Sequence, residues 1–216
     1  MSIVIGKIFM KPTLLHIGCS VGSIVDTTPG FQDGQWNEIR LDIDPAVQPD
    51  MIGSICDLSK IANNSIDAIY SSHNIEHIYH HQVPQALSEM YRVLHSSGFL
   101  ILTCPDLQSI CSLVVNDQLE DPAYMSAVGP ITPLDVLFGY SQDISKGNEF
   151  MAHKTGFTKS TITKHVLAAH FEDVITFRRP KYFDLWVLAT KSKWTTRNRK
   201  KVLQAHFGHF QREDLA

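Results

Sequence analysis

Paired cysteines, long hydrophobic runs and an excess of charge of one sign are all missing from this sequence. The four cysteines are scattered and form no Cys-x-x-Cys pair, so we expect free thiols and a reducing, cytoplasmic location. No apolar run reaches the roughly 18 residues of a membrane-spanning helix, and we expect no membrane partner. The formal net charge of −3 gives no general attraction to nucleic acid or anionic lipid.

Targeting and low-complexity segments are missing too. Residues 1–12, MSIVIGKIFMKP, lack the charged region, long apolar core and small-residue cleavage site of a signal peptide, so none is expected. No internal repeat or biased segment interrupts the chain. Its 216 residues, 44% hydrophobic and 19% charged, are enough for one globular domain with a sizeable core.

Short apolar runs alternate with helical patterns, which is typical of an α/β fold. TLLHI (13–17), for example, is an apolar run that ends at a glycine, as expected of a buried parallel strand. Apolar residues at helical spacing predict a helix over about 86–94, ended by a left-handed cap at Gly98, and another after Thr158. The predicted strands cover residues 13–17, 38–43, 50–55, 66–72, 98–104, 173–177 and 184–190.

One segment, residues 105–157, breaks this alternation. It is rich in proline, glycine and aromatic residues, and insertions of this size in a compact domain are usually lids or binding loops. We therefore predict a single domain over residues 1–191, with a lid or substrate insertion at about 105–157. Residues 192–216 contain a basic cluster and are expected to be a C-terminal tail, either a solvated helix end or a frayed terminus.

The stretch LLHIGCSVGSI (14–24) allows three interpretations. The Gly-x-Ser-x-Gly pattern at 18–22 matches the nucleophile elbow of serine hydrolases, but no HGGG-like stretch is present to supply the oxyanion hole. The stretch also resembles a dinucleotide-binding loop in which Ser20 and Ser23 replace two glycines. That loop requires a helix after it to bind phosphate, and a proline and a glycine at 29–30 would soon interrupt one.

The third interpretation is a glycine-rich loop that holds S-adenosylmethionine. Residues 15–22, LHIGCSVG, compare with an apolar strand followed by acid-apolar-Gly-Cys-Gly-x-Gly. Further matching stretches are RLDIDP (40–45), CDL (56–58), IDAIYSSHNIEHI (66–78) and YRVLHSSGFLILTCPD (91–106). With these stretches in this order and spacing, the sequence resembles the class I S-adenosylmethionine-dependent methyltransferases, in particular the type-11 methyltransferase domain group.

The resemblance implies a Rossmann-like three-layer α/β sandwich with a seven-stranded, mostly parallel sheet whose last strand is antiparallel. It implies an enzyme that transfers a methyl group from S-adenosylmethionine and leaves S-adenosylhomocysteine as product. We expect a small or medium-sized acceptor and no nucleic acid partner, because no basic stripe with interleaved aromatic residues is present. The acceptor itself and the oligomeric state stay open.

The resemblance also implies cofactor-binding residues at the ends of the predicted strands. Gly18 and Gly22 would let the backbone approach a ligand, and Asp42 could accept hydrogen bonds from both ribose hydroxyls. Asp57 would accept from the adenine amino group, and Leu58 would offer its backbone N–H. A turn or cap role is the plain alternative for both aspartates. The full expected set is His16, Gly18, Ser20, Gly22, Asp42, Ile43, Asp57, Leu58, Ser72 and His73.

Two residues depart from the family pattern. His16 stands where an acid is usual, and Ser20 stands where a glycine is usual. The broken helix expected after the loop is a third departure. Together they indicate an altered pocket at the amino-acid end of the cofactor. The alternative is a regulatory module that binds the cofactor without catalysis.

The histidine-rich stretch HNIEHIYHH (73–81) points to different chemistry. It begins with H-x-x-E-H, the inverted zincin pattern, and His73, His77 and His81 would share one face of a helix. The pattern follows directly on a predicted strand, however, and Pro84 would interrupt the long helix that a zincin requires. A zinc-dependent hydrolase is therefore an alternative function only, and we expect no metal ligands.

Three residues are candidate catalytic bases. A methyltransferase needs a base only if its acceptor must lose a proton, since the sulfonium is already an activated leaving group. His73 and Asp106 follow predicted strands, and His153 lies in the predicted lid. A histidine pKa of about 6.5 suits proton transfer near neutral pH, but packing within the lid explains His153 equally well.

Overall fold

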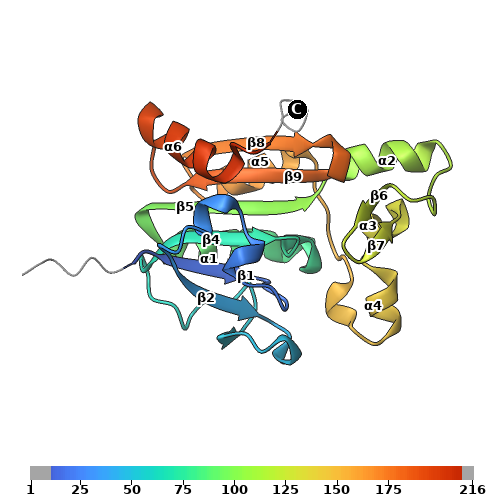
Figure 1. The fold of residues 1–216 in the computed structure, drawn as a ribbon, viewed down its shortest axis with the longest axis horizontal. Coiled ribbons are helices and arrows are strands. Elements are labelled where there is room, and N and C mark those ends of the chain that lie inside the picture. Colours follow the sequence, from blue (N-terminus) through green and yellow to red (C-terminus); the bar gives the residue numbers. More distant parts are fainter. Residues whose placement is uncertain (1–10, 211–216) are drawn as a thin grey trace, which may run out of the picture.

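The computed structural model describes residues 11–210, which form one large sheet with helices on both faces (Figure 1). The strands of this sheet are β1 Thr13–Ile17, β2 Asn37–Asp42, β3 Met51–Ile52, β4 Ile66–Ser72, β5 Leu94–Pro105, β8 Asp173–Arg179 and β9 Asp184–Thr190. Their order is β3-β2-β1-β4-β5-β9-β8. Neighbours from β3 to β5 are parallel, and β9 is antiparallel to both β5 and β8. The predicted Rossmann-like sandwich with an antiparallel last strand is confirmed.

Helices and short 3₁₀ turns complete the described part of the chain. The helices are α1 Val83–Val93, α2 Leu107–Val115, α3 Pro133–Phe138, α4 Ser141–Ser145, α5 Lys159–Ala168 and α6 Thr196–Phe207. The 3₁₀ turns are η1 Ile24–Asp26, η2 Pro29–Phe31, η3 Pro45–Val47, η4 Ile75–His77, η5 His80–Gln82, η6 Glu149–Met151 and η7 Pro180–Tyr182. Within residues 11–210, no helix combines the length and the apolar character that crossing a membrane requires.

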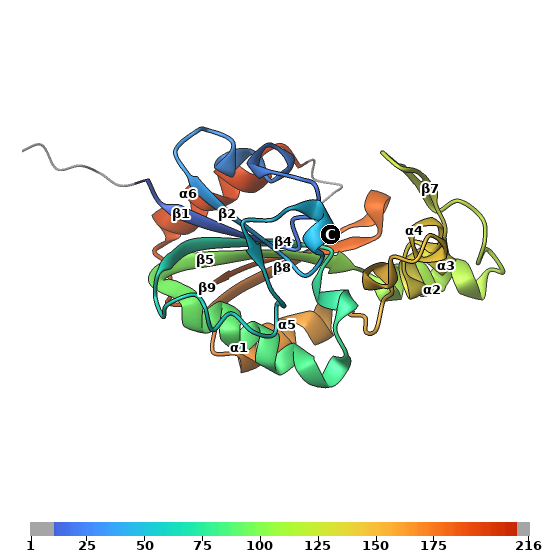
Figure 2. The same cartoon turned by 90° about the horizontal axis from the view of Figure 1, so that it is seen from below.

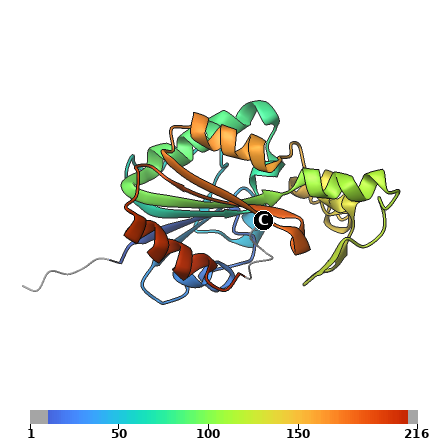
Figure 3. The same ribbon diagram turned by 90° about the horizontal axis from the view of Figure 1, so that it is seen from above.

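Buried apolar side chains lie on both faces of the sheet, because helices cover both sides of its central strands. Successive residues of β1 alternate between the two faces, so that Leu14 belongs to one core cluster and Leu15 to the other. Helices α1 and α5 pack on the Leu15 side (Figure 2). On the Leu14 side lie α6 and the turns after β1 (Figure 3). This double burial explains why the strands read as continuous apolar runs.

Two boundaries differ from the prediction. Helix α1 ends at Val93 and β5 begins at Leu94, so Gly98 lies inside a strand and the predicted left-handed cap is wrong. A Cβ atom on Gly98 would lie 3.0 Å from the carbonyl oxygen of Asp67 in β4, so glycine serves the close approach of two strands there. Strand β3 has only two residues, well inside the predicted range 50–55.

Helix α6 covers a face that the segment after β1 leaves open. Residues 24–31 form only the turns η1 and η2, as the proline and glycine at 29–30 predict. Helix α6 packs there and buries His206 and Phe207, while its basic residues Arg197, Lys200 and Lys201 are exposed. Arg199 of the same cluster is half-buried and pairs with Asp173, so the cluster is only partly solvated, and its helix is packed on the sheet.

Residues 105–157, the lid segment, extend beyond the carboxyl ends of the parallel strands (Figure 1). The segment contains α2, α3, α4 and a small hairpin of β6 Tyr124–Ser126 and β7 Gly129–Ile131. Its two ends meet, because the Leu107 N–H donates to the Phe157 carbonyl oxygen over 3.0 Å. The predicted insertion thus leaves the domain and returns to it at the same place, beside the end of β5.

His206 joins α6 to the turns after β1. Its Nδ1 lies 2.7 Å from Thr28 Oγ1, and its ring stands edge-on to Phe31 with 4.4 Å between centroids. A Cβ atom on Gly30 would come within 2.6 Å of the imidazole, so glycine is required under the ring. The side chain is buried, and burial lowers its pKa from 6.5 to about 4.

We predict that His206 makes the fold sensitive to mild acid. Above pH 6.5 both states hold it neutral. As the pH falls from 6.5 toward 4, the unfolded chain takes up a proton that the folded protein does not, so stability is lost. The loss from this residue is about 2 kcal/mol by pH 5. Urea unfolding at pH 7 and pH 5 should show a smaller pH effect, by about this amount, in His206→Gln than in wild type. Equal pH dependence would contradict the prediction.

Candidate active site

The loop after β1 requires glycine at its first position. Gly18 has a φ of +66°, and a Cβ atom there would lie 2.4 Å from the side-chain nitrogen of Asn74. Ser20 also has a left-handed backbone, with a φ of +49°. The loop therefore keeps the backbone conformation of a glycine-rich loop although Ser20 replaces a glycine.

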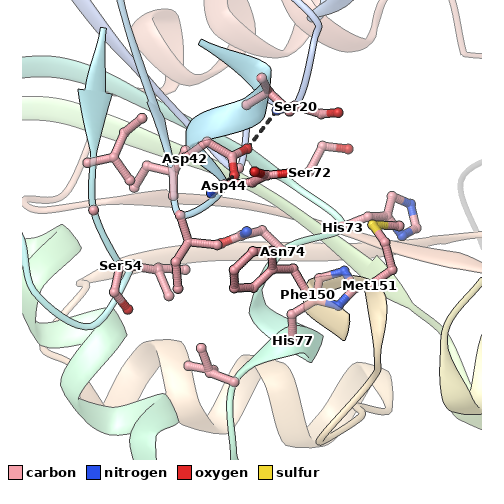
Figure 4. A pocket seen from close by; sticks show the side chains of 18 of the residues that line it. Ser20, Asp42, Asp44, Ser54, Ser72, His73, Asn74, His77, Phe150 and Met151 are labelled. Atoms are coloured by element: carbon pink, nitrogen blue, oxygen red, sulfur yellow. Dashed lines mark hydrogen bonds between the residues drawn. The ribbon is translucent and has the colours of Figure 1, made fainter. Parts of the chain in front are cut away.

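Asp42 fixes this loop from the end of β2. Its carboxylate accepts the backbone N–H of Ser20 over 2.7 Å and that of Asp44 over 3.0 Å (Figure 4). The Asp44 side chain instead accepts from the Ala46 N–H over 2.8 Å and caps η3. Asp42 thus lies at the strand end where open α/β sheets bind ligands, and its carboxylate has lone pairs left for further hydrogen bonds.

Two further residues of β2 hold the loop, and the sequence analysis missed both. The Arg40 guanidinium donates to the carbonyl oxygens of Ser20, Gly22 and Gln48 over 2.8, 2.9 and 3.0 Å. The Glu38 carboxylate accepts the Ile24 N–H over 2.9 Å. Because Glu38, Arg40 and Asp42 alternate along a strand, they share one face. That alternation is the signal that could have identified them.

His16 lies behind the loop and not in a cavity. Its Nδ1 is 2.8 Å from Glu38 Oε1, and its ring stands edge-on to Tyr70. Burial lowers its pKa, and the Glu38 hydrogen bond and charge oppose this effect only in part. The acid that the family pattern has at position 16 is therefore supplied near this place by Glu38.

A pocket of about 250 Å³ opens at the carboxyl ends of β1, β2 and β4. We call it the strand-end pocket (Figure 4). Asn148, Phe150, Met151 and Lys154 line it from the lid side, and none of them was predicted as a site residue. The expected cofactor residues that line it are Gly18, Ser20, Asp42, Ile43, Ser72 and His73.

The remaining expected cofactor residues lie outside the strand-end pocket. Asp57 is exposed and accepts the Ser59 N–H over 3.0 Å, which is the geometry expected of its alternative role as a cap. Leu58 is buried, and its N–H already donates to Glu89 over 2.9 Å. Ser54 and Ile55 line the pocket on this side instead. Gly22 lies one turn beyond it, with its N–H bonded to the Cys19 carbonyl oxygen over 2.9 Å.

A second cavity of about 330 Å³, the lid chamber, lies between the lid segment and the sheet. Aromatic and apolar side chains predominate in its wall, among them Tyr124, Ile131, Val136, Tyr140 and Phe183. His73, His77 and Met151 line both the lid chamber and the strand-end pocket. The two spaces are therefore neighbours that meet at these side chains.

Of the three candidate bases, Asp106 lies outside both cavities. Its buried carboxylate caps α2 by accepting the Gln108 N–H over 3.2 Å, and it pairs with the Arg178 guanidinium. These partners already account for its charge. The structure gives Asp106 a positioning role at the base of the lid segment.

His73 lies at the junction of the two cavities, between two buried carboxylates. Its Nδ1 is 3.3 Å from Glu76 Oε1, and its Nε2 is 3.9 Å from Asp184 Oδ2. Desolvation lowers the pKa of the half-exposed His73 ring, but the negative charges of Asp184 and Glu76 outweigh it and raise the pKa to about 10. This shift favours the protonated form of His73, which cannot accept a proton.

His153 projects from the lid segment into the lid chamber. Its Nδ1 lies 2.8 Å from the carbonyl oxygen of Val136, and its ring is 4.9 Å from that of His77. Burial lowers the pKa of His153. Of the three candidates, it is the one that combines a neutral ring with a place in the chamber wall.

The H-x-x-E-H stretch does not form a zincin helix. His73 has a φ of +48°, and only Ile75–His77 are helical, as the 3₁₀ turn η4. His81 lies outside both cavities and stacks on Tyr79. His73, His77 and His81 therefore do not share a helix face, and the geometry does not support the zinc-hydrolase alternative.

Comparisons with known proteins agree with this architecture. Residues 15–102 match the family described as a methyltransferase domain, and no curated protein matches the chain. The fold is similar to that of the PH0226 protein from Pyrococcus horikoshii OT3, with a TM-score of 0.56, 12% identity, and coverage of 84% of this chain and 82% of the other. It is also similar to that of an S-adenosylmethionine-dependent methyltransferase from Archaeoglobus fulgidus. The TM-score is 0.53 at 14% identity, over 84% of this chain and 87% of the other.

A third similar structure is the 1,6-didemethyltoxoflavin-N1-methyltransferase of Burkholderia thailandensis, with bound 1,6-didemethyltoxoflavin and S-adenosylhomocysteine. Its TM-score is 0.51 at 14% identity, over 85% of this chain and 72% of the other. Likeness at these identities shows the fold. The family match covers the glycine-rich loop, the ends of β2 and β4 and most of β5, so this part of the chain is similar to a methyltransferase domain.

Proposed function

We propose that this methyltransferase acts on a small or medium-sized acceptor bound in the lid chamber, with the cofactor in the strand-end pocket. The observation that carries the proposal is the boundary between these two spaces. His73, His77 and Met151 line both of them, so molecules bound on the two sides would be neighbours. Methyl transfer requires this proximity, because donor and acceptor atoms must be held in line.

The residues of the strand-end pocket fit the proposed cofactor. Close backbone approach at Gly18 and a carboxylate at Asp42 match a ligand that carries ribose hydroxyls. S-adenosylmethionine supplies a methyl group on a sulfonium that is already activated. The work left to the chain is to position both molecules. Phe150 and Met151 of the lid segment line the pocket and would help to exclude water once the cofactor is bound.

The lid chamber favours a small molecule over a polymer. Its volume of about 330 Å³ and its aromatic wall are typical of sites for small organic ligands. The bound heterocycle in the structurally similar Burkholderia enzyme supports the same size class. We propose no nucleic acid or membrane partner. Free thiols at all four cysteines support the proposed cytoplasmic location.

We predict that S-adenosylhomocysteine binds the folded protein and that Asp42→Ala weakens this binding at least tenfold. The substitution removes the acceptor for the ribose hydroxyls and also releases the Ser20 N–H, and a hydrogen bond to a charged group contributes about 1.5–3 kcal/mol. Isothermal titration calorimetry measures both affinities.

Asp44→Ala is the matched control for this experiment. Asp44 also lines the strand-end pocket, but its carboxylate is engaged by Ala46, so we expect a smaller effect. Equal losses of S-adenosylhomocysteine affinity in both variants would show that the two aspartates share the binding of the ribose hydroxyls. No binding to folded wild-type protein at millimolar ligand would contradict the proposed function itself.

We also predict that Arg40→Ala weakens S-adenosylhomocysteine binding about five- to tenfold, although Arg40 need not touch the ligand. Three carbonyl oxygens would lose their shared donor, and the loop at residues 18–22 would loosen, at about 1 kcal/mol for each hydrogen bond. Arg40→Lys should restore little, because an ammonium cannot span three acceptors as the planar guanidinium does. Unchanged affinity in Arg40→Ala would show that the loop is fixed without it.

A further inference from the structure

Three potential metal ligands from two parts of the chain meet in the wall of the lid chamber. Glu76 and His77 belong to the turn η4, and His153 comes from the lid segment. One ligand atom from each lies within 4.8 Å of the others. Backbone hydrogen bonds hold the two parts together, because the N–H groups of Lys154 and Thr155 donate to the Glu76 carbonyl oxygen over 2.8 and 3.1 Å.

In both histidines Nδ1 faces a backbone carbonyl oxygen, which leaves Nε2 on the other side of the ring. His77 Nδ1 lies 3.2 Å from the carbonyl oxygen of Ala152, and His153 Nδ1 lies 2.8 Å from that of Val136. A carbonyl oxygen can only accept, so each Nδ1 carries the hydrogen of these bonds. Each Nε2 then has a free lone pair. Metal-binding histidines in proteins are commonly oriented in this way by a carbonyl partner.

Glu76 supplies a carboxylate that lacks hydrogen-bond donors. The residue is 1% exposed, and neither side-chain oxygen accepts a hydrogen bond. The nearest cation, His73, approaches only Oε1, at 3.3 Å. Burial of a carboxylate is costly unless it is paired or coordinates a metal, and His73 is shared with Asp184. A second cation beside Glu76 would supply the missing partner.

We propose that Glu76, His77 and His153 form a binding site for a divalent transition-metal ion such as Zn²⁺. Two imidazoles and one carboxylate suit such ions, with metal–ligand bonds of about 2.0–2.2 Å. One ligand atom of each residue lies within 4.8 Å of the others, so the side chains would have to move closer together to bind one ion. This set differs from the H-x-x-E-H pattern, because its third ligand is His153 of the lid segment and not His73. The expectation of no metal ligands would then be wrong.

Three protein ligands leave at least one coordination position open, and all three residues line the lid chamber. A hydroxyl or amine bound at that position would lose its proton more readily. This consequence rests on the proposed function and narrows the acceptor to molecules with an ionisable O–H or N–H. Metal binding itself does not depend on the cofactor, so the two proposals can fail separately.

The test is titration of chelator-treated full-length protein with ZnCl₂ alone, followed by calorimetry and by thermal unfolding. We expect one tight site and a rise in melting temperature, since the ion binds the folded state. Glu76→Gln and His153→Ala should each weaken that site at least about tenfold, by analogy with the losses that follow removal of residues orienting a metal ligand. His81→Ala is the control and should bind as wild type does, because His81 is exposed outside the cluster.

Cobalt(II) substitution identifies the ligands independently of stability. Nitrogen and oxygen ligands should give visible d–d absorption without the sulfur charge-transfer band that cysteine would produce. His153→Ala serves if Glu76→Gln does not fold, and its S-adenosylhomocysteine affinity should stay within threefold of wild type. Absence of a zinc site in folded wild-type protein, or an undiminished site in His153→Ala, would overturn the proposal. If folded wild-type protein does not bind S-adenosylhomocysteine, that result contradicts the proposed function and not the metal site.

Discussion

The glycine-rich loop is held by the side chains of β2, and the rest of the candidate site depends on this arrangement. Asp42 accepts the Ser20 N–H, and Arg40 donates to the carbonyl oxygens of Ser20 and Gly22 in the loop. In folds where a long helix follows such a loop, the helix itself anchors the chain. Here only short turns follow, so the adjacent strand provides the anchor. One face of β2 thereby both shapes the loop and presents a carboxylate to the ligand pocket.

The missing helix also explains the opposite end of the chain. Because no long helix follows β1, nothing in the neighbouring sequence covers Phe31 and the aromatic side chains around it on this face of the sheet. Helix α6 covers them, and His206 fills the space above Gly30. A segment far away in sequence thus completes the layer that local sequence cannot form. Because the His206 ring is buried in this contact, the stability of the fold depends on pH.

Much of the fold could be predicted, because buried parallel strands read as apolar runs and their carboxyl ends collect polar residues. Asp42, Ser72 and His73 were predicted in this way, and they line the strand-end pocket. Asp57 and Leu58 do not line it, because the chain after β3 turns earlier and brings Ser54 and Ile55 there. The contact of His16 with Glu38 could not be predicted, because Glu38 lies on another strand. The meeting of His153 with Glu76 depends on the path of the whole lid segment, which no local pattern encodes.

The departures from the family pattern are compensated in the structure, and this bears on whether the protein has lost its activity. Ser20 keeps a left-handed backbone at a cost of about 1–2 kcal/mol relative to glycine. Hydrogen bonds from its N–H to Asp42 and from Arg40 to its carbonyl oxygen offset that cost. Near position 16, Glu38 supplies the acid that the pattern lacks. The loop is therefore held in a defined conformation, which favours an altered pocket over a degenerate one.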